Sequence, residues 1–166
     1  LGGGALYDAV SYALIPCEGM LTRIFFPTTV TAMVDCAVGG KSALERPENL
    51  RLIGSHHPPD RVCVDPDLTA SLKDRMFFGG LAEALKLGCS LDAPLFHLME
   101  SLPDRSEAEF LLEEIIIRCA RIKSRALGEE AGREGLFFGH EIASAIELSQ
   151  RYQALLHGEA VAIGML

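Results

Sequence analysis

The first part of the chain alternates short apolar runs with stretches whose apolar residues recur at helical spacing. Apolar runs of this length predict buried strands, and the helical stretches end at proline or glycine. In chain order the predicted elements are a helix over 8–15, a strand over 23–26, a helix over 28–34 and a strand over 61–66. Strands that alternate with helices predict an α/β lobe with a parallel sheet.

From about residue 72 the apolar pattern is helical throughout. The predicted helices cover 78–87, 93–100, 107–127, 139–148 and the residues from 157 onward. We expect these helices to be separated by Pro94, by Pro103 and by the stretch 128–135. The glutamates and Arg133 of this stretch are expected to lie in a solvated loop. We therefore predict a boundary near residue 70, with an all-helical lobe after it.

Composition and charge exclude several classes of protein. Hydrophobic residues make up 49% of the chain, which is too apolar for a disordered segment. No stretch approaches the roughly 18 apolar residues of a membrane span. The 15 Lys and Arg against 23 Asp and Glu give a net charge of −8, without the basic surface that nucleic acid or an anionic membrane requires. We expect neither partner, whereas a small anionic substrate in a local basic pocket is compatible with this charge.

The ends of the chain predict that it is part of a longer protein. Leu1 is not an initiator methionine and does not begin a signal peptide. The last residues lie inside an apolar run that has no helix-stop signal. We expect the central part of a larger protein, with its apolar content explained by a buried position.

The cysteines indicate neither disulfides nor a cysteine-built zinc site. They are odd in number, widely spaced and without a CxxC pair. We expect all of them to be buried in a reducing compartment: Cys17, Cys36, Cys63, Cys89 and Cys119.

Two glycine clusters are candidates for anion binding. Gly2, Gly3 and Gly4 precede a predicted helix, whose free N–H groups can bind a pyrophosphate; the alternative is a tight strand-to-helix turn. Lys41 follows a Gly-Gly pair without the spacing of a P-loop. It could contact a phosphate, or it could be a solvated lysine beside a glycine turn.

Glu83, His140 and His157 are candidate metal ligands. Each lies in a predicted helix or at its start, beside small residues. Two histidines and one carboxylate are typical of a catalytic zinc with an open coordination position. The three are far apart in sequence, so spacing alone leaves structural histidines as the alternative. Lys86 follows Glu83 by one helical turn and is expected on the same side of the helix.

Taken in order, these segments resemble the 3-dehydroquinate synthase family of sugar-phosphate cyclases. The matching pieces are Gly2–Gly4 with Asp8, Pro27-Thr28-Thr29, Asp35 with Val38-Gly39-Gly40-Lys41, Leu52-Ile53-Gly54, Gly80-Leu-Ala-Glu83-Ala-Leu-Lys86, Gly139-His140, Ala145-Ile-Glu147 and the run from His157 to Gly164. The resemblance runs the length of the chain.

The resemblance implies a fold and two cofactors. Residues 1–70 would belong to an NAD-binding α/β domain and 71–166 to a C-terminal helical metal-binding domain, each incomplete in this chain. NAD would be contacted by Gly2, Gly3, Gly4, Asp8, Thr28, Thr29 and Asp35. A divalent metal, zinc in most of the family, would be held by Glu83, His140 and His157. The side chains facing substrate would be Lys41, Lys86, Lys123 and Arg133.

The resemblance also implies a reaction. NAD would transiently oxidise a secondary alcohol of a seven-carbon sugar-acid phosphate, and zinc would polarise the alcohol and the resulting ketone. Phosphate elimination, reduction and an aldol closure would then give 3-dehydroquinate, in the shikimate pathway of aromatic amino acid biosynthesis. The full-length lyase would be a cytoplasmic homodimer, and this chain alone is expected to be inactive.

The chain departs from the family pattern at positions expected to recognise phosphate. Gly19 stands in place of an arginine, Leu50 and Arg51 replace a Lys-Asn pair, Phe137 replaces an asparagine, and Ser144 replaces a histidine. Three alternatives follow: a related cyclase that makes cyclitols for secondary metabolism, a metal-dependent polyol dehydrogenase, and a degenerate homologue without catalysis.

Overall fold

The N-terminal part of the chain contains one long helix, short strands and tight helical turns. A computed structural model describes residues 1–17, 19–46, 49–150 and 153–166. Its elements up to residue 70 are α1 (Gly4–Ala13), the 3₁₀ turn η1 (Ile15–Cys17), β1 (Ile24–Phe25), the π-helical turn η2 (Ala32–Cys36), β2 (Lys41–Arg46), β3 (Asn49–His56), β4 (Arg61–Val62) and the 3₁₀ turn η3 (Pro66–Thr69). The helix predicted over 8–15 thus begins at Gly4, and that predicted over 28–34 is η2.

A parallel strand pair is present, but it is less buried than the sequence predicts. β1 and β4 pair in parallel, with Phe25 opposite Val62, and Gly2 forms a parallel bridge to Pro27. Val62 and Val64 are 37% and 38% exposed, so the prediction of a buried strand over 61–66 is wrong. The reason is that, within the described ranges, β4 has β1 as its one strand partner.

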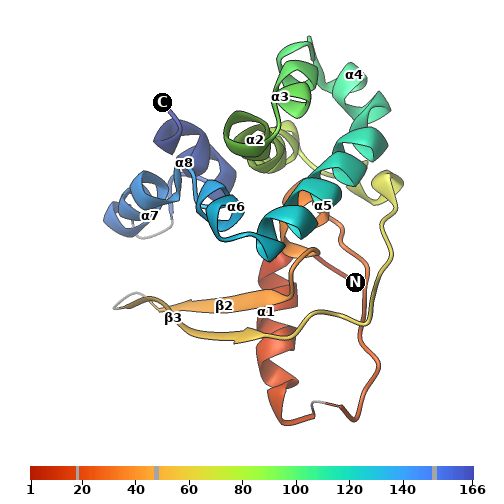
Figure 1. Cartoon of the computed structure of the whole chain (residues 1–166), viewed down its shortest axis with the longest axis vertical. Helices are drawn as coiled ribbons and strands as arrows, with labels where there is room; N and C mark the ends of the chain where they lie inside the picture. The colour runs from red at the N-terminus through yellow and green to blue at the C-terminus, as the bar shows by residue number, and fades with distance from the viewer. Residues whose placement is uncertain (18, 47–48, 151–152) are drawn as a thin grey trace.

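An antiparallel hairpin, which the sequence did not predict, follows the Gly-Gly pair. β2 and β3 pair from Lys41 opposite His56 to Arg46 opposite Asn49, and the two strands run side by side next to α1 (Figure 1). Gly39 and Gly40 turn the chain into β2 with φ angles of +107° and +70°. A Cβ on Gly40 would lie 2.3 Å from the Pro58 nitrogen, so this turn requires glycine for both its conformation and its close packing.

The part of the chain after residue 70 is helical, and its helices lie above the β2–β3 hairpin in the view of Figure 1. They are α2 (Asp74–Leu91), α3 (Ala93–Glu100), α4 (Arg105–Phe110), α5 (Leu112–Gly128), α6 (Glu130–Gly135), α7 (His140–Ser149) and α8 (His157–Gly164). Two predictions here are wrong. The helix over 107–127 is broken at Leu111, and the predicted loop at 128–135 contains α6. Gly132 allows α6 to pack on the end of α5, because a Cβ there would lie 2.7 Å from the Ala126 Cα.

The largest hydrophobic core joins both parts of the chain. Val30, Met33 and Val34 lie in one cluster with Phe77 of α2 and Ile115 of α5, and each is at most 1% exposed. Burying an aliphatic or aromatic side chain of this size contributes roughly 1.5–3 kcal/mol. The segment around η2 is therefore fixed against α2 and α5. The division into domains near residue 70 stays a prediction.

The cysteines are free thiols, but the prediction that all are buried is wrong. Cys119 is buried in the core between α5 and its neighbours, Cys17 and Cys36 are partly exposed, and Cys63 and Cys89 are exposed. Cys63 follows the uncovered strand β4, which explains its exposure. In the described part of the chain, no helix has both the length and the apolar character needed to cross a membrane.

Candidate metal centre and its surroundings

Glu83 reaches the candidate centre from the middle of α2, where two glycines precede it. A Cβ on Gly80 would lie 2.5 Å from the Val30 Cβ and 2.6 Å from the Thr31 nitrogen, so α2 packs directly against the segment that leads into η2. Glu83 is 1% exposed. A carboxylate this buried is stable only when charged or polar partners surround it.

His140 is the first residue of α7 and is held in place by the turn before it. Gly139 has a φ of +76°, and a Cβ there would lie 2.9 Å from Met165 Cγ and 3.0 Å from the Val161 carbonyl oxygen. α7 therefore begins in close contact with α8. This contact brings the His140 ring within 5.3 Å of the His157 ring, centroid to centroid.

His157 is the first residue of α8, and an ion pair anchors that end of the helix to α2. Arg75 donates two hydrogen bonds to the Glu159 carboxylate, at 2.6 and 2.7 Å, and a third to the Ala154 carbonyl at 2.6 Å. Glu159 in turn accepts from the Leu156 N–H. Bidentate pairs of this kind fix geometry as well as adding energy.

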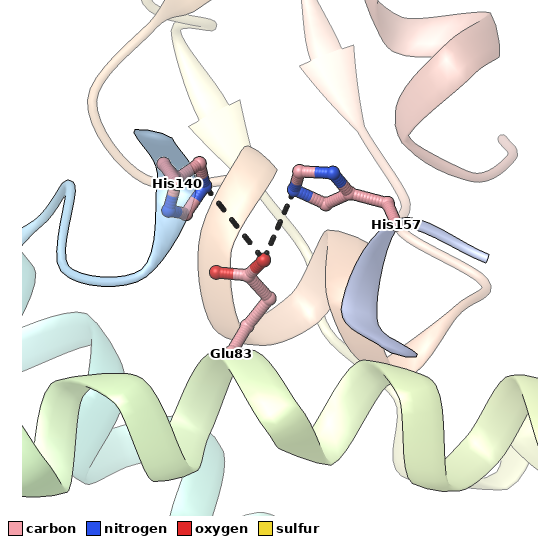
Figure 2. Close-up of side chains that lie close together, drawn as sticks. All are labelled: Glu83, His140 and His157. Atoms are coloured by element: carbon pink, nitrogen blue, oxygen red, sulfur yellow. Dashed lines mark ion pairs between the residues drawn. The ribbon is translucent and has the colours of Figure 1, made fainter. Parts of the chain in front are cut away.

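The three candidate ligands converge on one point (Figure 2). Their ligand atoms all lie within 4.8 Å of one another. Glu83 Oε1 lies 3.1 Å from His157 Nε2 and 4.0 Å from His140 Nε2. Among the described residues this buried oxygen has no hydrogen bond of acceptable geometry. Two nitrogens and an unsatisfied oxygen facing one point fit a divalent cation, and zinc with an open fourth position is the usual occupant of such a set.

The protonation states of Glu83 and His140 fit a metal site directly, whereas that of His157 does not. Burial alone would raise the pKa of Glu83, but His157 and Lys86 outweigh it and lower the pKa, so the group is a carboxylate. Burial lowers the pKa of His140, which favours a neutral ring. Burial acts the same way on His157, but Glu83 and Glu147 outweigh it and raise its pKa to about 9. A metal must therefore displace a proton from His157.

A network of alternating charges extends from the triad and is fully buried at Lys86 and partly buried at Asp35 and Lys123. Lys86 Nζ donates to Glu83 Oε2 at 2.6 Å and lies 4.0 Å from Asp35 Oδ1. Lys123 Nζ, from α5, lies 2.6 Å from the same Asp35 oxygen. Lys86 is 1% exposed, and Glu83 and Asp35 raise its pKa against the opposing effect of burial. The network places Lys86 on the candidate ligand Glu83 and joins Lys123 to Lys86 through Asp35. Contact of either lysine with substrate stays a prediction.

Lys86→Met is expected to destabilise the protein by about 3–5 kcal/mol, because it leaves the buried Glu83 carboxylate without its ammonium partner, whereas Asp35 keeps Lys123. Denaturant unfolding of the zinc-free complete protein measures the free energy of unfolding with and without the substitution. Lys73→Met, at an exposed residue before α2, is the matched control and should change stability by less than about 0.5 kcal/mol. Equal effects of the two substitutions would contradict a balancing role for Lys86.

Lys41 and Arg133 are less closely tied to the triad. Lys41 Nζ lies 5.0 Å from the centre of the Phe137 ring, and that ring lies 6.3 Å from the His140 ring. Lys41 is thus on the His140 side of the centre. Arg133 is exposed, and its Nε donates to the Leu127 carbonyl at the end of α5, 3.0 Å away. Substrate contact by either residue stays a prediction.

The glycine turn before α1 packs closely on its neighbours and leaves the helix N-terminus without a capping side chain. A Cβ on Gly2 would lie 2.5 Å from Leu6 Cδ2, and one on Gly4 would lie 2.8 Å from Cys36 Sγ. Gly3 precedes the helix without a side-chain cap, so the first N–H groups of α1 are not used by a capping side chain. A turn without side chains at a ten-residue helix N-terminus fits a pyrophosphate, as found in dinucleotides.

The other predicted NAD residues surround this turn or lie beyond it. Thr28 N–H donates to the Gly2 carbonyl at 3.0 Å, and Thr29 Oγ1 accepts from the Ala32 N–H. Asp8 Oδ1 accepts from the Ala43 N–H in β2 at 3.3 Å, which ties α1 to the hairpin. Asp35 lies instead in the lysine network. Contacts of these side chains with NAD stay predictions.

The positions that depart from the family pattern are only partly described. Gly19 is exposed with a φ of +74°, and a Cβ there would meet nothing within 4 Å. Ser144 is half-buried on α7. Leu50 and Arg51 belong to β3, but their side chains lie outside the described part of the chain.

Sequence reasoning missed two residues that hold His157 or its helix in place. Arg75 anchors α8 through Glu159, and Glu147 accepts a hydrogen bond from His157. Arg75 carries no local signal, since its partner is far along the chain. Glu147 belongs to one of the segments that carry the resemblance, although no role was inferred for it.

Comparison with known proteins identifies the family. The family model described as 3-dehydroquinate synthase N-terminal matches residues 1–79, and the one described as 3-dehydroquinate synthase C-terminal matches residues 80–166. The two models together match residues 1–166, so the whole chain corresponds to adjoining N-terminal and C-terminal parts of one protein family. The chain belongs to the 3-dehydroquinate synthase family, which confirms the resemblance seen in the sequence.

Curated relatives and solved structures agree with this assignment. The chain is 39% identical to the 3-dehydroquinate synthase of Clostridium kluyveri and 40% identical to that of Thermosynechococcus vestitus, with 99% and 100% of this chain covered. It spans 47% of each relative, or about half of its length.

Two solved structures are similar in fold. One is a 2-epi-5-epi-valiolone synthase of Streptomyces hygroscopicus with NAD⁺ and Zn²⁺ bound, at a TM-score of 0.78 and 30% identity. The other is a 2-deoxy-scyllo-inosose synthase complexed with carbaglucose-6-phosphate, NAD⁺ and Co²⁺, at 0.81 and 25%. The chain covers 48% and 47% of these two structures, and they cover 99% of it.

Proposed function

We propose that the complete protein carrying this chain is a phosphate-eliminating lyase of the 3-dehydroquinate synthase type. It would convert a seven-carbon sugar-acid phosphate to the carbocycle 3-dehydroquinate in the shikimate pathway. The observation that carries the proposal is the convergence of Glu83, His140 and His157 beside the Lys86–Asp35–Lys123 network. The family assignment and the names of the curated relatives support the same reaction.

Two cofactors fit the residues present. Glu83, His140 and His157 would hold zinc, and the Gly2–Gly4 turn would take the pyrophosphate of NAD. When bound, NAD supplies reversible hydride transfer and zinc supplies polarisation of a substrate oxygen. The solved relatives with NAD⁺ and Zn²⁺ or Co²⁺ support this pair.

The chain's own charged groups would bind and orient the substrate. The ammonium group of Lys86 is held by Glu83 and that of Lys123 by Asp35, and each can donate to a carboxylate or hydroxyl of the substrate. Asp35, between them, can accept from a substrate hydroxyl. Lys41 and Arg133 would bind the remaining anionic groups. Such fixed charges around a buried centre favour one orientation of an anionic sugar.

A related cyclase that makes cyclitols is the second candidate. The observation that favours it is Phe137, an apolar ring lying between Lys41 and His140 where the family pattern predicts asparagine. Gly19 likewise offers no side chain to a phosphate. Both solved relatives named above are cyclases of this kind. Homodimer formation and a cytoplasmic location remain predictions for either candidate.

The test is made on the complete protein, purified and analysed for metal and for NAD binding. We expect retained zinc, saturable NAD binding, and phosphate release from the seven-carbon sugar-acid phosphate without net NADH. Phosphate release from sedoheptulose 7-phosphate alone would favour the cyclitol cyclase. Net NADH from a glycerol-like alcohol would indicate a polyol dehydrogenase. Absence of both ligands would indicate a non-catalytic homologue.

A further inference from the structure

Glu147 is a buried carboxylate that the proposed reaction does not use. It lies on α7, is 5% exposed, and its Oε1 is 2.8 Å from Nδ1 of His157. Burying a carboxylate is costly unless a partner compensates it. The partner here is one of the candidate metal ligands, so the position of that ligand depends on Glu147.

The bond to Glu147 determines which nitrogen of His157 faces the triad. A carboxylate accepts, so Nδ1 must carry the hydrogen, and in the neutral ring Nε2 then carries the lone pair. Nε2 is the nitrogen that lies 3.1 Å from Glu83 Oε1. The contact therefore selects the tautomer and the ring orientation that a metal at the triad requires.

The placement of Glu147 on α7 links it to a second ligand. His140 and Glu147 are seven residues apart on one helix, which is close to two turns, so they lie on the same face. α7 packs against α8 through a small core of Ala143, Ala160 and Val161. One helix thus supplies a candidate ligand directly and orients another through a hydrogen bond.

We propose that Glu147 is a positioning residue of the metal centre, holding His157 so that its Nε2 faces the ion. This inference rests on the proposed metal site. It predicts that removing the carboxylate weakens metal binding although no ligand is lost. Loss of such an outer partner typically lowers metal affinity 10- to 100-fold.

The experiment measures zinc affinity of the complete protein by competition with a chromogenic chelator. Glu147→Leu and the smaller Glu147→Ala should each bind zinc 10- to 100-fold more weakly. Glu147→Gln keeps an acceptor oxygen and should stay within a few-fold of the unsubstituted protein. The visible absorption spectrum of the Co²⁺-loaded protein should change in Glu147→Leu and Glu147→Ala but not in Glu147→Gln. Glu141→Gln and Glu141→Leu, at an exposed residue of the same helix, are the matched controls and should change neither quantity.

The outcomes separate this inference from the proposed function. Zinc affinity within twofold of the unsubstituted protein in a folded leucine or alanine variant would overturn the positioning role while leaving the metal site intact. A Glu147→Gln variant that binds zinc as weakly as Glu147→Leu would also overturn it, because the retained acceptor oxygen would then have no effect on zinc binding. Absence of zinc binding in the unsubstituted protein would overturn the metal site and the inference together.

Discussion

Replacing His157 with alanine is expected to reduce the zinc content of the complete protein to background while NAD binding survives. A site built from three protein ligands cannot retain the ion through purification when one imidazole is removed, because the two that remain leave half of a tetrahedral shell to water. The glycine turn proposed for NAD is unaffected, since α1 packs on β2 and η2 whereas α8 packs on α2 and α7. Metal analysis after gel filtration and a fluorescence titration with NAD measure the two properties separately.

His97→Ala is the matched control for this substitution. His97 lies on α3 with its side chain 71% exposed and an ion-pair distance of 3.4 Å to Glu100. Its removal should leave both zinc and NAD binding unchanged. Unchanged zinc content in His157→Ala would show that the ligand inferred from the family resemblance is wrong. Loss of NAD binding along with zinc would show that the two sites are coupled more tightly than the packing of α1 and α8 implies.

Local signals predicted the helices whose ends are determined by local chemistry. α3 spans the predicted range 93–100, because Asp92 accepts from the Leu95 N–H and Pro94 favours the first turn. The chain pattern also placed His140 and His157 at or beside the start of a helix, as the structure has them. These features depend on neighbours within a turn or two, so they are readable from the sequence.

Features decided by distant contacts were missed. α6 forms in a glycine-containing stretch of weak helix propensity, because Gly132 and Gly135 allow it to pack against Ala126 and Leu91. The break at Leu111 interrupts an apolar period that continues across it. Exposure of β4 depends on how many strands flank it. Propensity and periodicity carry no information about such partners.

The candidate site likewise combines features that the sequence predicted with contacts that it did not. The residue types of the triad are visible in the sequence, but spacing alone left structural histidines as an alternative, and the family resemblance was needed to join them. The structure adds that Glu83, His140 and His157 converge with an unsatisfied Glu83 oxygen. The contacts that Arg75 and Glu147 make could not be predicted, since each joins two different helices, and how two helices pack is not readable from local spacing.

Gly158→Ala is expected to displace α8 and remove the metal site without changing any ligand. A Cβ at this position would lie 1.7 Å from the Gly79 carbonyl oxygen and 2.5 Å from its carbonyl carbon. These are backbone atoms in the middle of α2, so they cannot move aside as a flexible side chain can. Inserting atoms into a packed interior costs typically 1–3 kcal/mol, and a clash with backbone lies at the upper end. Thermal unfolding and zinc content of the complete protein measure the two effects.

Gly128→Ala is the control that distinguishes packing from glycine content. Gly128 is the last residue of α5, and a Cβ there would meet nothing within 4 Å. Alanine at this helical position should therefore be neutral or stabilise the protein by up to about 1 kcal/mol. Retention of both stability and zinc by Gly158→Ala would mean that α8 can move away from α2 while His157 still faces Glu83. In that case the direct backbone contact between Gly79 and Gly158 would not be what positions the ligand.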